Sequence, residues 1–192
     1  MDKLSANGTI QSDYAEQLRK EHDGSKWGST GARYSGEDLA RVIASRPYLQ
    51  TALDFGCGKG TLSQAFPELV WQEYDPGIPG KDHIPSGSFD LVTNTDVLEH
   101  VEPHLLDNVL LVLQDKTDKV LFLDIACYPT GKVFGEGPYV GQDLHLIIQD
   151  PEWWKERVCT AMHALTLVYF NSKEMLSKGK YKKRAILVME RV

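Results

Sequence analysis

The sequence predicts an α/β domain built on a mostly parallel sheet, with an antiparallel hairpin strand at its C-terminal end. Three observations support this fold class. An apolar strand runs into a glycine turn at Leu53–Gly60, and a second strand then ends in the acidic run Glu73–Asp75. The apolar segment Lys119–Ile125 is typical of a parallel strand that is buried on both faces. Two further strands, Ala164–Phe170 and Arg184–Glu190, close the chain as a hairpin.

Length and charge indicate the number of domains and argue against some classes of partner. The 192 residues suffice for one domain with its own core, so we expect a single domain over residues 1–192. A formal net charge of −6 argues against a broad basic face for duplex DNA. No apolar stretch is long enough to span a bilayer, and the N-terminus lacks the apolar core of a signal peptide. The scattered cysteines Cys57, Cys127 and Cys159 suggest reduced thiols and a cytoplasmic location.

The first half of the chain alternates between helical and strand patterns. We expect a helix at Ser12–His22, a Gly- and Ser-rich loop at Asp23–Ser35, a helix at Gly36–Ala44, strands at Thr51–Phe55 and Leu69–Tyr74, and a helix that starts near Gly60. Ser12 can cap the first helix. Leu39, Val42 and Ile43 share one face of the second helix, and Pro47 ends it.

The region after the second strand is shorter than a complete α/β unit requires. Only about ten residues separate Asp75 from Pro85, whereas a helical crossover between parallel strands needs about a dozen or more. Proline and glycine residues within this interval also break regular structure. We therefore expect a shortened third strand and a lost or vestigial helix.

The second half of the chain completes the sheet and its helical cover. We expect a strand at Phe89–Asn94, an amphipathic helix at Pro103–Leu113, the buried strand at Lys119–Ile125, a helix at Pro151–Met162 and the two closing strands. Leucine and valine recur at helical spacing in the first of these helices, and Pro151 suits the first turn of the other. Residues 126–149 form a long connection rich in glycine and proline, and long loops in compact domains are usually functional or disordered.

The glycine turn carries the most informative motif. Asp54, Gly56, Gly58 and Gly60 spell D-x-G-x-G-x-G at the end of a strand, which differs from the dinucleotide-binding pattern G-x-G-x-x-G. Glycines at such a turn let the backbone approach a ligand closely. A carboxylate at the tip of the next strand, here Asp75, can accept hydrogen bonds from ribose hydroxyls. The pair indicates a site for an adenosine-containing ligand.

This turn resembles motif I of the class I S-adenosylmethionine (SAM) dependent methyltransferases. Three further segments match that family in the right order: Tyr74–Pro76 after the second strand, Ser88–Val92 as the family's fourth strand, and Asp96–Val101 after it. The resemblance covers residues 53–101 and implies a Rossmann-like sheet, SAM as the cofactor and methyl transfer as the activity. A late histidine followed by Pro-Glu-Trp-Trp also looks similar to bacteriophage-encoded members of the family.

The resemblance implies which residues hold the cofactor. The expected cofactor-binding residues are Asp54, Gly56, Cys57, Gly58, Gly60, Asp75, Pro76, Ile84, Thr95 and Asp96. Asp54 and the backbone of the turn would hold the methionine end, Asp75 would accept from the ribose, and the segment near Ile84 would flank the adenine. Asp75 could instead cap a helix or a turn, and Cys57 is interpreted as a small residue that fits the turn.

A second group of residues could act on the methyl acceptor. Asp96, Glu99 and His100 fall at i, i+3 and i+4, so they share one face if the segment is helical. They could bind a divalent metal ion, with His145 or His104 completing the shell. The pattern resembles the metal site of the small-RNA 3′-terminal 2′-O-methyltransferases, with Asp in place of the first Glu, and a related pattern occurs in ubiquinone-pathway O-methyltransferases. The preferred alternative is metal-free, with this segment supporting SAM and the start of a helix.

His145 is a candidate catalytic residue together with His100 and Glu99. It lies late in the long connection, and an imidazole pKa near working pH would let it act as general base on a hydroxyl. A structural histidine bonded to backbone is the equal alternative. A histidine base, and the lack of an amide clamp for base amines, predict O-methylation rather than N-methylation.

The long connection and the N-terminal segment are expected to enclose the acceptor. Residues 1–35 would form an N-terminal tail or lid, with Tyr14 and Trp27 covering the cofactor, and residues 126–149 would form an acceptor-side loop. The basic segment Lys178–Arg184 could meet phosphate or form a solvated hairpin tip.

Three functions compete at this point. The first is metal-free methylation of a small molecule or a single-stranded nucleotide. The second is metal-assisted 2′-O-methylation of an RNA 3′ end. The third is a SAM-binding partner subunit with no activity of its own.

Overall fold

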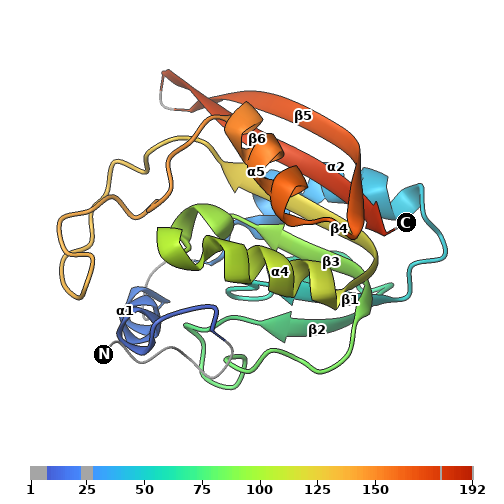
Figure 1. Ribbon diagram of the computed structural model, residues 1–192, viewed down its shortest axis with the longest axis horizontal. Helices are drawn as coiled ribbons and strands as arrows, with labels where there is room; N and C mark the ends of the chain where they lie inside the picture. Colours follow the sequence, from blue (N-terminus) through green and yellow to red (C-terminus); the bar gives the residue numbers. More distant parts are fainter. Residues whose placement is uncertain (1–7, 23–27, 178, 192) are drawn as a thin grey trace.

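The strands of the described residues form one sheet in the order β2-β1-β3-β4-β6-β5 (Figure 1). The structure is a computed structural model, and it describes residues 8–22, 28–177 and 179–191. The strands are β1 (Thr51–Phe55), β2 (Val70–Tyr74), β3 (Phe89–Thr95), β4 (Thr117–Ala126), β5 (Leu165–Ser177) and β6 (Lys180–Arg191). Strands β1 to β4 pair in parallel, whereas β6 is antiparallel to β4 and β5 is antiparallel to β6. This arrangement confirms the predicted fold class.

Helices cover both faces of the sheet. They are α1 (Ser12–His22), α2 (Gly31–Ala44), α3 (Thr61–Ala65), α4 (Leu106–Lys116) and α5 (Pro151–Ala161), with 3₁₀ turns η1 (Leu98–His100) and η2 (Pro103–Leu105) before α4. In Figure 1, α4 and α5 lie in front of the sheet and α2 lies behind it. Among the described helices, none is long and apolar enough to cross a membrane.

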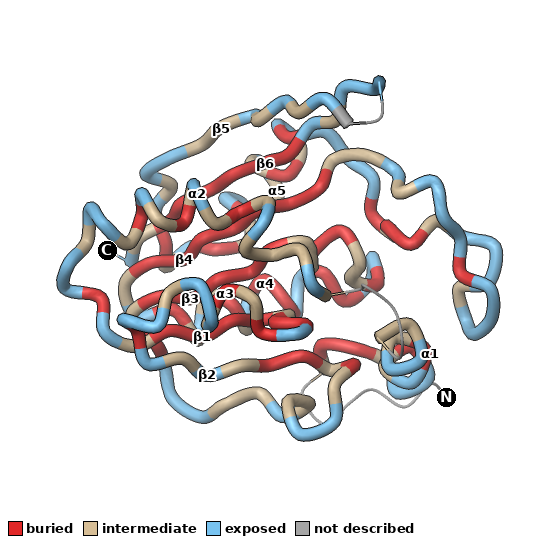
Figure 2. Tube along the Cα trace, turned by 180° about the vertical axis from the view of Figure 1, so that it is seen from behind, coloured by how far each residue is buried: buried red, intermediate tan, exposed pale blue. Residues whose placement is uncertain are grey.

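The alternation of side chains along β4 explains why its sequence is apolar throughout. Leu121 and Leu123 join the core cluster formed with α4 and α5, whereas Val120 and Phe122 join the cluster formed with α2 and α3. Successive strand residues point to opposite faces, and helices cover both. The tube in Figure 2 is correspondingly buried along β4 and the neighbouring strands.

A third, smaller core joins the N-terminal helix to the long connection. Ile10 and Tyr14 pack with Phe134 and Leu144, which lie far along the chain in the 126–149 segment. The ring of Tyr14 is 6.0 Å from that of Phe134 in an edge contact. Figure 1 shows α1 and the long connection at the same end of the molecule, where the parallel strands finish. This end is where ligands bind in open α/β sheets.

Several elements differ from their predicted bounds for clear physical reasons. α2 begins at Gly31 rather than Gly36, so part of the expected loop is helical. Residues 75–88 contain no strand or helix; Asp75 instead donates its backbone N–H to the carbonyl of Lys81 at 2.8 Å in a turn. The basic hairpin tip is mostly strand, because β5 and β6 pair as far as Ser177 and Lys180.

Candidate active site

The glycine turn after β1 packs tightly against its neighbours. Gly56, Gly58 and Gly60 have φ angles of +89°, +50° and +68°. A Cβ at Gly56 would lie 2.2 Å from Cγ2 of Val97, and one at Gly58 would lie 2.4 Å from the carbonyl oxygen of Gly28. Left-handed backbone with such close neighbours leaves room only for glycine.

Asp75 lies directly beside this turn, at the end of β2. Its Oδ2 accepts a hydrogen bond from the backbone N–H of Gly58 at 2.9 Å, and its Oδ1 accepts from Gly77 N–H at 2.9 Å. Nε2 of His22, on α1, is 3.6 Å from the same Oδ1. The carboxylate is buried, so α1 would have to give way before a ribose could reach it.

Asp54 occupies a different position from the one expected for a ligand contact. It is buried within β1, where its Oδ1 accepts a hydrogen bond from the hydroxyl of Thr93 on β3 at 3.0 Å. Burial raises the pKa of this carboxyl to about 7. The side chain thus supports the strand ends beneath the turn.

The other residues expected to hold the cofactor surround the same turn or pack beneath it. Cys57 and Thr95 are buried, and burial raises the pKa of the Cys57 thiol. Pro76 lines a small cavity, whereas Ile84 packs against the core cluster of α4 and α5. Trp27, the expected lid residue, lies outside the described residues.

A small apolar cavity separates the turn from α1. It measures about 60 Å³ and is lined by Gly56, Pro76 and Val97 on one side and by α1 side chains such as Tyr14 and Leu18 on the other. Small-molecule sites usually enclose about 300–1,000 Å³. A ligand of nucleoside size therefore fits only if α1 moves outward.

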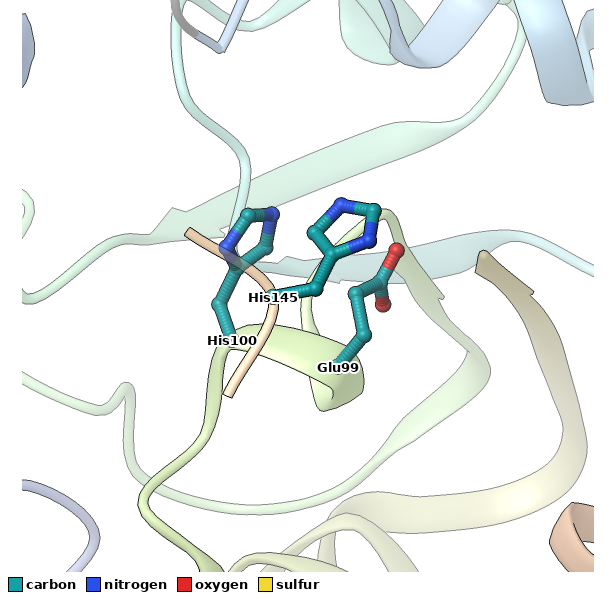
Figure 3. A group of neighbouring side chains, drawn as sticks. All are labelled: Glu99, His100 and His145. Carbon is teal, nitrogen blue, oxygen red and sulfur yellow. The ribbon is translucent and has the colours of Figure 1, made fainter. Parts of the chain in front are cut away.

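Glu99, His100 and His145 form a compact cluster near this cavity (Figure 3). One ligand atom from each lies within 4.8 Å of the others. The two imidazole rings meet edge to face with centroids 4.7 Å apart. Figure 3 shows Glu99 and His100 extending from η1 toward His145, which comes from the 126–149 segment. Of the predicted catalytic residues, all three are brought together.

Backbone carbonyls orient both histidines. Nδ1 of His100 lies 2.7 Å from the carbonyl oxygen of Leu144, and Nδ1 of His145 lies 2.6 Å from that of Tyr128. A carbonyl only accepts, so each Nδ1 carries the proton and each lone pair is on Nε2. Metal-binding histidines are held in this way, with the second ring nitrogen donating to a carbonyl or carboxylate.

The protonation states of the cluster follow from its burial. Burial lowers the pKa of His100 to about 4 and lowers that of His145. Burial also raises the pKa of Glu99 to about 8. Oε1 of Glu99 accepts from the N–H of Ala126 at 3.0 Å, but Oε2 is buried without a hydrogen-bond partner. The cluster thus presents two neutral imidazoles and an incompletely satisfied carboxyl.

The sequence matches no protein-family model and no curated protein sequence. The fold does match solved structures. Magnesium protoporphyrin IX methyltransferase from Synechocystis PCC 6803, with bound S-adenosylhomocysteine (SAH), aligns with a TM-score of 0.60 and 18% identity over 94% of this chain and 95% of that one. A Burkholderia thailandensis 1,6-didemethyltoxoflavin N1-methyltransferase, also with SAH, aligns with a TM-score of 0.59 and 15% identity. The alignment covers 100% of this chain and 93% of that one.

The chain has the class I methyltransferase fold. The small RNA methyltransferase HEN1 shares it as well, with a TM-score of 0.59 and 14% identity over 82% of this chain, which spans 25% of that protein. The predicted fold family is therefore confirmed. The solved relatives act on different kinds of acceptor according to their names, so the fold does not select among acceptors.

Within this methyltransferase fold, Asp96 is not part of the cluster, contrary to the prediction. The segment 98–100 is a 3₁₀ turn, and Asp96 precedes it with a φ of +55°, so the i, i+3, i+4 spacing of an α-helix does not apply. Its carboxylate instead accepts from Nη2 of Arg184 at 2.6 Å. Nε of Arg184 donates to Asp124, also at 2.6 Å. His104, the other candidate ligand, is exposed and lies beside Gln11.

The acceptor pocket expected between the N-terminal segment and residues 126–149 is filled by side chains. Tyr14 packs edge-on against Tyr139 with ring centroids 4.9 Å apart, and its hydroxyl donates to the carbonyl of His100 at 2.8 Å. Gln17 donates to the carbonyl of Glu136 at 2.6 Å. The apolar faces of α1 and the loop bury each other, so this space is closed.

The sequence patterns did not indicate two residues that support the site, Arg184 and Asp124. Arg184 was considered only as part of a basic segment, yet it is fully buried between Asp96 and Asp124. Asp124 was counted within an apolar strand. A single carboxylate inside a strand buried on both faces requires a buried cation, and that signal could have indicated the pair.

Proposed function

We propose that this chain is a SAM-dependent O-methyltransferase that binds a divalent metal ion at Glu99, His100 and His145. The observation that carries the proposal is the geometry of this cluster beside the glycine turn. Fold neighbours crystallised with SAH support SAM as the methyl donor. Three cysteines without disulfides agree with a cytoplasmic enzyme.

The residues of the cluster suit a metal ion. Two imidazole nitrogens and one carboxylate oxygen match the two-histidine, one-carboxylate set that holds first-row divalent ions with open positions. Both histidines have Nδ1 tied to a carbonyl, which directs Nε2 as the ligand. The buried Oε2 of Glu99 has no hydrogen-bond partner, and a bound cation would satisfy this oxygen.

The chemistry then divides between the two halves of the site. Gly56–Gly60 and Asp75 would hold SAM, once α1 has moved away from Asp75. A divalent ion bound to the cluster would lower the pKa of a coordinated acceptor hydroxyl. Glu99 and the histidines would hold the ion that orients this hydroxyl. In the transfer, the acceptor oxygen bonds to the methyl carbon as the S–CH₃ bond breaks, SAH leaves, and the hydroxyl proton passes to solvent. Positioning supplies much of the rate in such transfers.

The preferred acceptor is a vicinal diol, as at the 3′ end of single-stranded RNA. Two neighbouring hydroxyls can occupy two open positions of one metal ion. A small-molecule diol is the other member of the same chemical class.

Manganese binding tests the metal site directly. We expect the protein, after dialysis against EDTA, to bind one Mn²⁺ with loss of the free-ion electron paramagnetic resonance signal. Glu99→Gln and His145→Gln should each weaken binding tenfold or more. His104→Gln is the matched control, because that exposed histidine lies close in sequence but outside the cluster. Equal Mn²⁺ binding by Glu99→Gln would remove the metal from the proposal.

Methyl transfer tests the function itself. With tritiated SAM, we expect product on single-stranded RNA that has a free 3′-terminal diol and none on RNA that ends in a 2′-deoxyribose. EDTA should abolish the transfer and Mn²⁺ should restore it. If calorimetry detects no binding of SAM or SAH, the function is refuted at its first step.

A metal-free mechanism is the second candidate, and the neutral state of His145 favours it. Burial lowers the pKa of His145, so its Nε2 can accept a proton at neutral pH. Transfer that survives EDTA and Glu99→Gln but fails in His145→Gln would select this mechanism. Binding of SAM without turnover until a second protein is added would instead select a partner subunit.

A further inference from the structure

Lys182 and Tyr128 form a cation–aromatic pair at the edge of the cluster. Nζ of Lys182 lies 4.2 Å from the centroid of the Tyr128 ring. Tyr128 follows β4, and Lys182 is near the start of β6, which pairs with β4. Both side chains are only half-buried, so the pair is accessible from solvent.

This pair is directly connected to His145. The ring centroids of Tyr128 and His145 are 5.7 Å apart, and Nδ1 of His145 donates to the backbone carbonyl of Tyr128. A group bound on Tyr128 would therefore lie next to the Glu99–His100–His145 cluster. On the α1 side of the cluster, side chains of the N-terminal segment and of residues 126–149 pack together and close this space.

The charge distribution leaves Lys182 available to an anion. Two neighbouring lysines are paired: Lys173 with Asp38 at 2.7 Å and Lys183 with Glu174 at 3.6 Å. No described carboxylate lies within 4 Å of the Lys182 ammonium. Its partner in the structure is an aromatic ring, which leaves its three N–H donors able to bind phosphate.

Arg184 removes the repulsion that would otherwise oppose an anion here. Arg184 forms ion pairs with two carboxylates on this side of the site, Asp96 and Asp124, each at 2.6 Å. Since it lies two residues after Lys182 on the same strand, the two cations share one face of β6. Arg184 is fully buried and cannot contact a ligand itself. Its positive charge instead balances the carboxylates of Asp96 and Asp124, which would otherwise repel an anion at Tyr128 and Lys182.

We propose that Tyr128 and Lys182 form an acceptor subsite that binds the nucleotide preceding the methylated one in single-stranded RNA. The inference rests on the proposed function. Tyr128 would stack on an unpaired base, and Lys182 would bind the phosphate that links it to the terminal ribose. Aromatic side chains interleaved with cations are the usual platform for single strands. Lys182 can bind one phosphate, and the net charge of −6 argues against a broad basic surface.

Binding of a short RNA tests the subsite without any need for turnover. The probe is a single-stranded RNA pentamer with a 5′-fluorescein and a free 3′ end, followed by anisotropy with SAH and Mn²⁺ present. We expect Lys182→Ala to weaken binding about tenfold and to reduce the slope of log affinity against log salt by about one. Lys182→Arg should retain the affinity. Tyr128→Ala should also weaken binding, whereas Tyr128→Phe should not.

Lys183→Ala is the matched control. Lys183 is on the opposite face of the same strand and is already paired with Glu174, so its loss should leave RNA affinity unchanged. Thermal melts of every variant establish that the fold is intact. Unchanged RNA affinity of Lys182→Ala, or an equal loss in Lys183→Ala, would overturn the subsite. So would a wild-type protein that binds the pentamer no better than uridine.

The two proposals fail in distinguishable ways. If Lys182→Ala weakens RNA binding but no hydroxyl is ever methylated, the subsite stands and the methyltransferase function falls. If the protein methylates an uncharged catechol in a metal-dependent way and Lys182→Ala has no effect on RNA binding, the function stands and the subsite is overturned.

Discussion

Single residues decide whether this site can exist at all, and the glycine turn is the clearest example. Gly56 and Gly80 have nearly the same φ, +89° and +85°, but different surroundings. A Cβ at Gly56 would overlap Val97, whereas a Cβ at Gly80 would meet nothing within 4 Å. At Gly80 only the backbone conformation favours glycine, whereas at Gly56 the packing of Val97 excludes a side chain as well.

We expect Gly56→Ala to destabilise the protein much more than Gly80→Ala. Left-handed φ costs a non-glycine residue about 1–3 kcal/mol at either position. Overlap with Val97 should add roughly 1–3 kcal/mol at position 56 alone, because a β-branched side chain has few alternative rotamers. Urea unfolding of the two variants measures the difference. Equal free energies of unfolding would show that Val97 moves aside without cost.

Glu99 should make stability depend on pH in a defined direction. Burial raises its pKa in the folded protein to about 8 from an ordinary value near 4.5. Between these values the folded protein holds a proton that the unfolded chain has lost, so the free energy of unfolding falls as pH rises toward 8 and then levels off. In EDTA, Tm should therefore fall less between pH 6 and 9 for Glu99→Gln than for wild type.

Asp54 also makes stability fall with rising pH, in the wild type and in Glu99→Gln alike, because burial raises its pKa to about 7. The informative quantity is therefore the difference between the two pH profiles. Parallel profiles would mean that Glu99 is ionised throughout this range. Mn²⁺ binds the ionised carboxylate, so its affinity should rise with pH until about 8.

At the scale of elements, α1 links the two halves of the site. His22 at its C-terminal end lies beside Asp75, while Tyr14 near its start bonds to the carbonyl of His100. Glu102 strengthens this contact by accepting from the backbone N–H of Gln11 and the hydroxyl of Tyr139. A cavity of about 60 Å³ beneath α1 is too small for SAM, so this helix has to move when the cofactor binds.

We expect Tyr14→Ala to loosen α1 without loosening the sheet. Its ring fills the small core with Phe134 and Tyr139, and its hydroxyl donates to the carbonyl of His100. Amide hydrogen exchange should therefore rise across 12–22 and 130–144 but stay slow in β3 and β4. Glu16→Ala, at an exposed position of the same helix, is the control and should leave exchange in 130–144 unchanged. Faster exchange in β3 would contradict a local role for Tyr14.

At the scale of the whole molecule, one sheet carries both large cores. Residues of β4 and β6 contribute to the cluster beneath α4 and α5 and also to the cluster beneath α2 and α3. The hairpin of β5 and β6 is therefore part of the central layer of the fold. Neither core can be complete without it.

We expect the chain to unfold as one cooperative unit. Because both cores share β4 and β6, the loss of either should disrupt the other. Urea transitions followed by tryptophan fluorescence and by far-ultraviolet circular dichroism should coincide, apart from early loss of α1. Two separated transitions of comparable size would show that residues 1–192 do not behave as a single domain.

Much of this fold could be predicted because its signals are local. Glycines at 56–60, the apolar strand at 119–125 and the proline at 151 each reflect a constraint within a few residues. The helix Ser12–His22 was predicted with its observed bounds for the same reason. The short interval after Asp75 predicted a lost helix and a shortened third strand, but residues 75–88 contain no strand at all.

The sequence by itself thus determined the class I methyltransferase sheet, the left-handed glycine turn with Asp75 beside it, and the candidate residues Glu99, His100 and His145. Only the tertiary structure decided which carboxylates belong together. Asp96 turns to Arg184 because its left-handed backbone and the buried Asp124 favour that ion pair over the cluster. It also decided that α1 closes the expected acceptor space, and that Tyr128 lies beside His145 with Lys182 over the Tyr128 ring. Such contacts join residues far apart in the chain, and no local pattern records them.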